Sequence, residues 1–248
     1  MKKNIKLSVI AFLIIFLLGA CGKNNEKTEE AKEEPITIYL VRHGKTFFNT
    51  TGQTQGWSDT PLTDVGEKQA EQVGKGLSEV KFVTAYSSDL GRQRKTAELI
   101  LKNNENKVPE LQEHIGFREF FYGGFEGSTD EEVMQIITEK TGIANWEEVT
   151  ADDIAAADDL GLAETTKEVN KRAKEAMTQV IEEAEKLGGG NVLIVSSGGM
   201  IPVLLEAVLP DNYQGENIGN GSVTTLTYQD GKYELLKIGD ESYVENNQ

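Results

Sequence analysis

The residues ITIYLVRHGKT, numbered 36–46, carry the pattern that decides the fold of this chain. Residues 36–41 are an almost unbroken run of apolar and β-branched side chains, which predicts a strand buried on both faces of a parallel sheet. Polar residues follow at once. Because open parallel sheets bind ligands at the carboxyl ends of their strands, Arg42 and His43 stand where a functional site is expected.

Strands and helices alternate along the rest of the chain. Hydrophobic spacing and stop signals predict helices over residues 63–80, 90–102 and 169–187. A further helix is predicted to begin at Pro202 and to end before Pro210. Short apolar runs predict strands, which cover residues 82–86, 192–195 and a hairpin of 223–228 with 233–238. This order predicts a three-layer α/β/α fold with a mostly parallel central sheet. We expect one domain over residues 36–240 and a tail over 241–248.

Residues 128–166 interrupt this order with an acidic segment. It is locally helical and carries eleven Asp and Glu residues but only one basic residue, Lys140. We interpret it as an acidic helical insertion packed on the sheet domain. The whole chain of 248 residues has 25 Lys and Arg against 41 Asp and Glu, a net charge of −16. This balance argues against a nucleic acid partner, whose phosphates require a basic surface.

The first 35 residues have the pattern of an exported lipoprotein. Three lysines precede an apolar run over residues 7–18, as in a signal peptide, and the run is shorter than the roughly 20 residues that span a bilayer. The LGAC sequence at 18–21 resembles a bacterial lipobox, which implies removal of residues 1–20 and lipid modification of Cys21. The polar residues after it, up to 35, are expected to form a disordered tether. The alternative is that Cys21 is a free thiol in a leader.

The lipobox resemblance implies a location for the protein. A lipid on Cys21, the only cysteine in the chain, would anchor the folded part to the outer face of the cytoplasmic membrane. A single cysteine also excludes an internal disulfide. Nothing in the sequence indicates an oligomeric state.

Two polar clusters follow the strands predicted at 36–41 and 82–86. In the first, Arg42 precedes His43, and Gly44 would let a ligand approach closely. In the second, residues 87–92 lead into a helix start whose backbone N–H groups favour anions, and Arg92 adds a planar guanidinium. Taken alone, each cluster also has a purely structural interpretation, as a hydrogen-bonded histidine or a capped helix with a surface arginine.

Four segments in order resemble motifs of the histidine phosphatase superfamily, which includes the cofactor-dependent phosphoglycerate mutases. They are RHGKTxxN at 42–49, QGWSDTPLT at 55–63, SSDLxR at 87–92 and REFFYGGFEG at 118–127. Three of the five arginines of the chain lie within them. The resemblance implies a phosphoglycerate mutase-like fold and extends over nearly all of residues 36–238.

The resemblance also implies roles for individual residues. His43 would be the nucleophile that forms a phosphohistidine, and Arg42, Asn49 and Arg92 would hold the phosphoryl oxygens. Glu119 would protonate the leaving group and then activate water, which calls for a pKa raised by burial. The resemblance implies no metal ion and no cofactor.

The last motif of the family departs from the expected SHGG, because residues 196–199 are SSGG. Ser197 therefore stands where the resemblance implies a second active-site histidine. A hydroxyl could still bind the phosphoryl group, but a neutral hydrogen bond is weaker than one from an imidazolium, which predicts a rate loss of about ten- to a few hundredfold. The other histidine, His114, could compensate if it borders the site; the alternative is a solvated loop histidine.

These patterns predict an extracytoplasmic phosphatase that hydrolyses a small phosphomonoester through a phosphohistidine, with activity reduced by Ser197. The alternative is a catalytically silent member of the fold that binds a phosphorylated ligand or a partner protein. A phosphoglycerate mutase is less favoured, because the insertion offers one lysine and no arginine to a substrate carboxylate. The acidic insertion should also repel polyanions, which favours a substrate of low charge.

Overall fold

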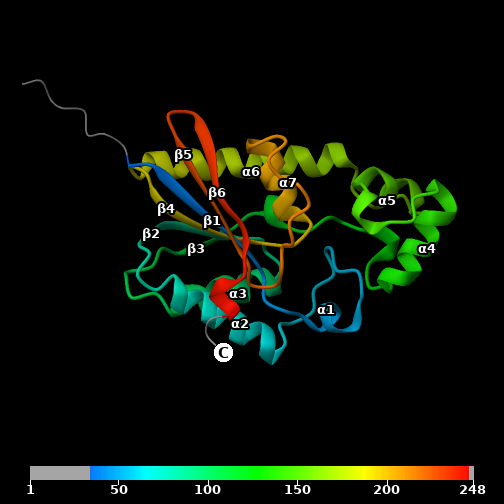
Figure 1. Cartoon of the computed structure of the whole chain (residues 1–248), viewed down its shortest axis with the longest axis horizontal. Coiled ribbons are helices and arrows are strands. Elements are labelled where there is room, and N and C mark those ends of the chain that lie inside the picture. Colours follow the sequence, from blue (N-terminus) through cyan, green and yellow to red (C-terminus); the bar gives the residue numbers. More distant parts are fainter. Residues whose placement is uncertain (1–33, 246–248) are drawn as a thin grey trace, which may run out of the picture. The chain divides into compact units, whose positions relative to one another are not determined.

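The computed structural model describes residues 34–245, whose elements are arranged around a six-stranded sheet (Figure 1). The strands are β1 (Ile36–Arg42), β2 (Phe82–Ser87), β3 (Leu111–Glu113), β4 (Gly190–Ser196), β5 (Val223–Gln229) and β6 (Lys232–Asp240). Their order across the sheet is β3-β2-β4-β1-β5-β6. The first four of that order are parallel, and β5 and β6 join them as an antiparallel hairpin.

Helices cover both faces of the sheet (Figure 1). The helices are α1 (Phe47–Thr51), α2 (Asp64–Gly76), α3 (Gly91–Lys102), α4 (Asp130–Thr141), α5 (Ala151–Ala157), α6 (Thr166–Lys186), α7 (Met200–Val208) and α8 (Ser242–Glu245). Side chains of α6 and α7 pack with one core cluster that includes Ile38 and Leu40. Side chains of α2 and α3 pack with a second cluster that includes Val41. The predicted three-layer fold with a mostly parallel sheet is confirmed.

The apolar run that begins β1 is explained by these two clusters. Ile36, Ile38 and Leu40 point to the side of α6, whereas Val41 points to the side of α2 and α3. A strand in the middle of a sheet with both faces covered needs apolar side chains on both faces, so no polar alternation remains.

Several element boundaries differ from the sequence prediction. Helix α2 ends at Gly76 rather than at residue 80, because the side-chain amide of Asn104 donates to the carbonyls of Leu77 and Val80 and holds the intervening residues as a turn. Helix α7 begins at Met200, with Pro202 in its first turn, where a missing N–H needs no partner.

The predicted tail is partly folded. Residues 242–245 form α8, and Val244 is buried in the cluster beneath α2 and α3. The hairpin turn is as predicted: β5 ends at Gln229, β6 begins at Lys232, and the two residues between them have positive φ.

The acidic insertion is helical, as expected, but it has its own small core. Helices α4 and α5 and the short 3-10 turn η3 (Trp146–Glu148) surround a cluster that includes Val133, Ile137 and Ile154. Helix α5 contacts α6, which extends past the sheet toward the insertion (Figure 1). The insertion therefore packs on the sheet domain, as expected, through the contact of α5 with α6, while most of its own apolar side chains contact one another.

The export signal, Cys21 and nearly all of the tether lie outside the described residues. Within residues 34–245, none of the helices combines the length and the apolar character needed to cross a membrane.

Candidate active site

The predicted site residues come together at the carboxyl ends of β1, β2 and β4, which are neighbours in the sheet. A cavity of about 630 Å³ opens there. Its lining includes Arg42, His43, Asn49 and Glu119. Arg92 and Ser197 are fully buried and stand behind this wall rather than in it.

The imidazole of His43 is held in one tautomer. Its Nδ1 lies 2.9 Å from the carbonyl oxygen of Gly44, which can only accept, so Nδ1 carries the hydrogen. Nε2 accepts from Nε of Arg92 at 3.3 Å and therefore presents a lone pair. Burial lowers the pKa of His43 well below 6.5, with further lowering by Arg92 and Arg42. His43 is thus a neutral imidazole with an unprotonated Nε2.

Arg92 is fixed by the loop before α2. Its guanidinium donates to the carbonyls of Gly56 and Ser58 at 2.7 and 2.8 Å and to Asp59 at 3.2 Å. Asp59 also accepts from the backbone N–H groups of Gly91 and Arg92 at the start of α3. The helix start that the sequence predicts to favour anions is therefore occupied by the carboxylate of Asp59.

Glu126, which sequence reasoning missed as an individual residue, organises that loop. Its carboxylate accepts from the backbone N–H groups of Gly56, Trp57, Ser58 and Tyr122. These bonds hold the carbonyls that in turn hold Arg92, so Glu126 acts on the site through the loop. The only signal in the sequence was its place in the REFFYGGFEG segment.

Arg42 presents an unsatisfied donor. One terminal nitrogen donates to the carbonyl of Ile218 at 2.5 Å, whereas the buried Nε has no hydrogen-bond partner among the described residues. Burial lowers the pKa of Arg42, opposed by the nearby Glu119. The guanidinium packs against Gly198, where an added Cβ would lie 3.0 Å from Cζ. Because Arg42 lines the cavity, an anion bound there would meet its guanidinium.

Asn49 is oriented by its neighbours. Its side-chain oxygen accepts from the backbone N–H of Thr46 and from the side-chain amide of Asn220. The same amide of Asn220 donates to the carbonyl of His43 at 3.0 Å. Asn220 therefore ties Asn49 to His43, a link that no sequence motif indicated.

The carboxyl group of Glu119 is buried at the cavity wall. It accepts from the backbone N–H groups of Phe120 at 3.0 Å and Gly199 at 2.9 Å. Burial raises its pKa above 4.5, against the lowering effect of these bonds and of Arg92 and Arg42. The direction is the one predicted for a group that donates and accepts a proton near neutral pH.

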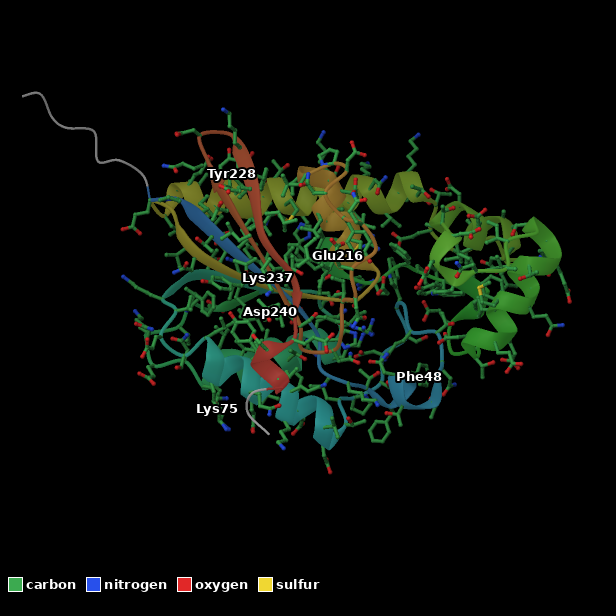
Figure 2. The ribbon with its side chains drawn as sticks, viewed as in Figure 1. Phe48, Lys75, Glu216, Tyr228, Lys237 and Asp240 are labelled. Carbon is green, nitrogen blue, oxygen red and sulfur yellow. The ribbon has the colours of Figure 1, made fainter. Side chains whose placement is uncertain are left out.

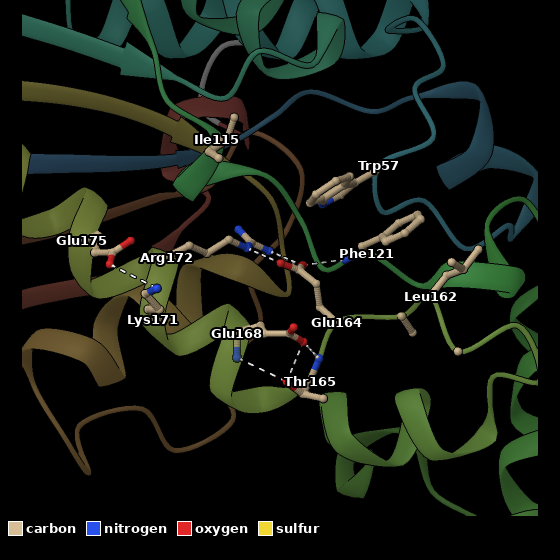
Figure 3. Close-up of a pocket in the computed structure, with 12 residues that line it drawn as sticks. Trp57, Ile115, Phe121, Leu162, Glu164, Thr165, Glu168, Lys171, Arg172 and Glu175 are labelled. Atoms are coloured by element: carbon tan, nitrogen blue, oxygen red, sulfur yellow. Dashed lines mark hydrogen bonds and ion pairs between the residues drawn. The ribbon is translucent and has the colours of Figure 1, made fainter.

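Arg172 and Glu164 form an ion pair (Figure 3) whose guanidinium also holds the backbone of Glu119. The guanidinium makes a bidentate pair with Glu164, both contacts at 2.8 Å, and the two side chains are 11% and 13% exposed. It also donates to the carbonyls of Arg118 and Glu119 at 2.8 and 2.9 Å. Sequence reasoning missed this pair. Arg118 itself pairs with Asp89 and lies over the ring of Trp57, outside the cavity.

Ser197 and His114 have local partners. The hydroxyl of Ser197 accepts from the side-chain amide of Gln93 at 2.5 Å, and the amide oxygen of Gln93 has no partner among the described residues. Nδ1 of His114 accepts from the backbone N–H of Gly116 and caps the turn η1 (Ile115–Phe117). His114 does not line the cavity.

Gly44 has a packing reason rather than the predicted ligand reason. A Cβ at this position would lie 2.2 Å from the carbonyl oxygen of Gly66 in α2, so the helix can approach the segment after β1 only if this residue is glycine. Within residues 34–245, no three His, Cys, Asp or Glu side chains are grouped to hold a metal ion.

Comparison with known proteins identifies the family. Residues 38–241 match the histidine phosphatase superfamily (branch 1), and the chain belongs to it. It is 30% identical to a broad-specificity phosphatase of Saccharomyces cerevisiae, over 84% of this chain and 90% of that protein. It is 28% identical to a metal-independent phosphoserine phosphatase of Arabidopsis thaliana, over 87% of this chain and 86% of that protein.

A solved structure agrees with this assignment. The crystal structure of phosphoglycerate mutase from Bacillus anthracis matches with a TM-score of 0.80 and 37% identity, over 86% of this chain and 96% of that chain. The predicted phosphoglycerate mutase-like fold and the predicted family are therefore confirmed.

Proposed function

We propose that this protein is a phosphatase that hydrolyses a small phosphomonoester through a phosphohistidine on His43. The observation that carries the proposal is the state of His43: a buried, neutral imidazole with the lone pair of Nε2 beside Arg92, in a cavity that also holds Arg42 and a buried carboxyl group. A neutral imidazole is nucleophilic without prior loss of a proton.

In the first step, Nε2 of His43 attacks the phosphorus atom and the ester P–O bond breaks. The departing oxygen takes the proton of Glu119 and leaves as the alcohol. The guanidinium of Arg42 and the amide of Asn49 hold phosphoryl oxygens, and Nε of Arg92 turns from Nε2 of His43 to the new phosphoryl group. Positioning and charge neutralisation supply most of the rate enhancement in such transfers.

In the second step, the carboxylate of Glu119 takes a proton from water as the water oxygen attacks phosphorus. The P–N bond breaks, its electrons return to Nε2 as the lone pair, and inorganic phosphate leaves. The raised pKa of Glu119 serves both steps, since the same group must donate and then accept.

The lining of the cavity favours a hydrolase over a mutase. Arg42 is the one basic residue among the described residues that line it, and the single lysine of the insertion, Lys140, pairs with Asp159. A phosphoglycerate would need a second cationic group for its carboxylate. The relatives named as phosphatases agree with this preference.

A catalytically silent binding protein is the second candidate, and Ser197 favours it. The hydroxyl is buried against Gln93 and does not line the cavity, so it does not supply the donor that the family's histidine would. In this case the cavity would still bind a phosphorylated ligand through Arg42 and Asn49.

One comparison of variants separates the two candidates. The full-length chain, purified in mild detergent, is assayed with p-nitrophenyl phosphate and tested for acid-labile phosphate. Turnover that His43→Ala abolishes supports the phosphatase. Activity that appears only after Ser197→His supports the silent protein, and no turnover and no phosphohistidine in the wild type would reject the phosphatase.

We further propose that the enzyme works outside the cytoplasm, anchored by a lipid on Cys21. The support is the LGAC sequence after a short apolar run, within residues 1–33, which are not described. When expressed in bacteria, the wild type should partition into the detergent phase of a cloud-point extraction, and Cys21→Ala should remain in the aqueous phase or as precursor. Identical partitioning of both proteins would contradict the anchor.

A further inference from the structure

The cavity at His43 has an outer end whose residues the proposed mechanism does not use. The inner end is formed by the site residues already described. The outer end is lined by acidic and aromatic side chains from the insertion and from the connection between α7 and β5, namely Asp130, Trp146, Glu147, Tyr213 and Glu216. Figure 2 shows Glu216 on that connection. At about 630 Å³, the cavity has room for a leaving group beyond the phosphoryl group.

The two ends carry opposite charge. Arg42, the one basic side chain among the described residues of the lining, belongs to the inner end, and its buried Nε lacks a partner. The outer end holds three carboxylates, and no ion pair of Asp130, Glu147 or Glu216 with a basic residue occurs among residues 34–245. A lining that holds both signs of charge suits a ligand with an anionic and a cationic group.

Tyr213 lines the same cavity as the acidic residues and contacts one of them, Glu216. Its hydroxyl donates to the backbone carbonyl of Glu216 at 2.9 Å. Burial raises the pKa of Tyr213, and the charges of Glu216 and Glu147 raise it further. Trp146 precedes Glu147 in the same turn and is 39% exposed, so its ring is available to a ligand.

We propose that the outer end binds an ammonium group, and that the substrates of this protein are phosphomonoesters of amino alcohols. Carboxylates attract the cation, and the faces of Trp146 and Tyr213 bind it through their quadrupoles. The same carboxylates and aromatic rings would bind a primary or a quaternary ammonium group. The proposal rests on the proposed function for the phosphoryl end, and it explains how an acidic cavity can accept a phosphate ester.

The test uses two esters of the same shape. Phosphocholine and 3,3-dimethylbutyl phosphate differ in one atom, a charged nitrogen in place of a neutral carbon. For the full-length enzyme we expect kcat/KM for phosphocholine to be about tenfold higher, a preference that shrinks at high salt. Equal or better turnover of the neutral ester would overturn the proposal, while turnover of p-nitrophenyl phosphate would leave the phosphatase function intact.

Binding measurements keep the proposal testable without turnover. Isothermal titration of Glu119→Gln with each ester should give an affinity about tenfold higher for phosphocholine. If no ester is hydrolysed by the wild type, the proposed function fails, yet this affinity ratio still decides the present proposal. A ratio of one or less rejects it.

Variants of the outer end assign the preference to residues. Glu147→Gln and Glu216→Gln should each lower the phosphocholine preference several-fold, and the double variant should remove it. The matched control is Glu148→Gln, one residue from Glu147 in the same turn but outside the cavity lining. An unchanged preference in the double variant, or an equal loss in Glu148→Gln, contradicts the assignment.

Discussion

The inner and outer ends of the cavity are built in different ways. At the inner end, His43 and Glu119 are 3% and 6% exposed, and each is hydrogen-bonded to backbone groups of the sheet domain. At the outer end, Trp146 is 39% exposed, and Glu147 and Glu216 lie on a short turn and a loop. At the inner end, the same residues therefore contribute to folding stability and to function. At the outer end, residues that contribute to function contribute little to folding stability.

The difference teaches how one fold can keep its chemistry while its substrate changes. A buried residue such as Glu119 is held by Arg172 and Gly199, so its replacement disturbs several contacts. Residues at the outer end have few such contacts and can change without loss of the fold. The following variants test this contrast, beginning with the largest expected effect.

Glu119→Gln should lower steady-state turnover of an alkyl phosphate by about 100- to 10,000-fold, because an amide cannot donate the proton that the leaving group needs. With p-nitrophenyl phosphate, a burst of one p-nitrophenol per protein should remain, since that leaving group departs without a proton. Stopped-flow absorbance measures the burst. The control is the exposed Glu110→Gln, and alkyl phosphate turnover close to the wild type would refute the role of Glu119.

Arg172→Met should lower the free energy of unfolding by about 3 kcal/mol, because it leaves the carboxylate of Glu164, which is 13% exposed, without its cationic partner. Urea titration followed by circular dichroism measures the change. Lys171→Met, at the neighbouring exposed position, should change the stability by less than about 0.5 kcal/mol. Similar values for the two variants would show that the inner end does not depend on this pair.

His43 should make stability depend on pH. Its pKa in the folded state is far below 6.5, so below pH 6.5 the unfolded chain binds a proton that the folded chain does not. The wild type should lose up to about 1.4 kcal/mol per pH unit between pH 6.5 and 5, and retain full stability above that range. His43→Gln should lack this component. Parallel urea curves at each pH measure it, and identical slopes for the two proteins would contradict a neutral, buried His43.

Trp146→Ala should have the smallest effect on folding, less than about 1 kcal/mol, because the side chain is 39% exposed. The same variant should lower the phosphocholine preference by a few-fold. The measurements are urea unfolding and kcat/KM for the two isosteric esters. A large loss of stability would mean that the outer end is structural as well, and the contrast between the two ends would disappear.

Much of the fold could be predicted because its signals are local. The apolar run of β1, the spacing of apolar residues in α6 and the QDGK turn each depend on residues close in sequence. The boundaries that were wrong depend on distant contacts. The end of α2 is set by Asn104, and the folding of residues 242–245 is set by the packing of Val244, neither of which a short window reveals.

The site residues show the same difference between local signals and distant contacts. Motif resemblance indicated His43, Arg42 and Glu119, and these residues line one cavity. It did not indicate Asn220 or Arg172, because these residues act through hydrogen bonds to the backbone of residues far away in sequence. Such partners have no periodicity and no fixed spacing from the groups that they hold.

The sequence by itself determined most of the strands and helices, the family and the types of side chain available for phosphoryl chemistry, because periodicity and short motifs are properties of neighbouring residues. It did not reveal the short elements β3 and α1. Only the tertiary structure decided the tautomer of His43, the burial that raises the pKa of Glu119 and the meeting of Arg42 with three carboxylates in the lining of one cavity. These properties depend on what the fold brings within a few ångströms, and on how much water it removes.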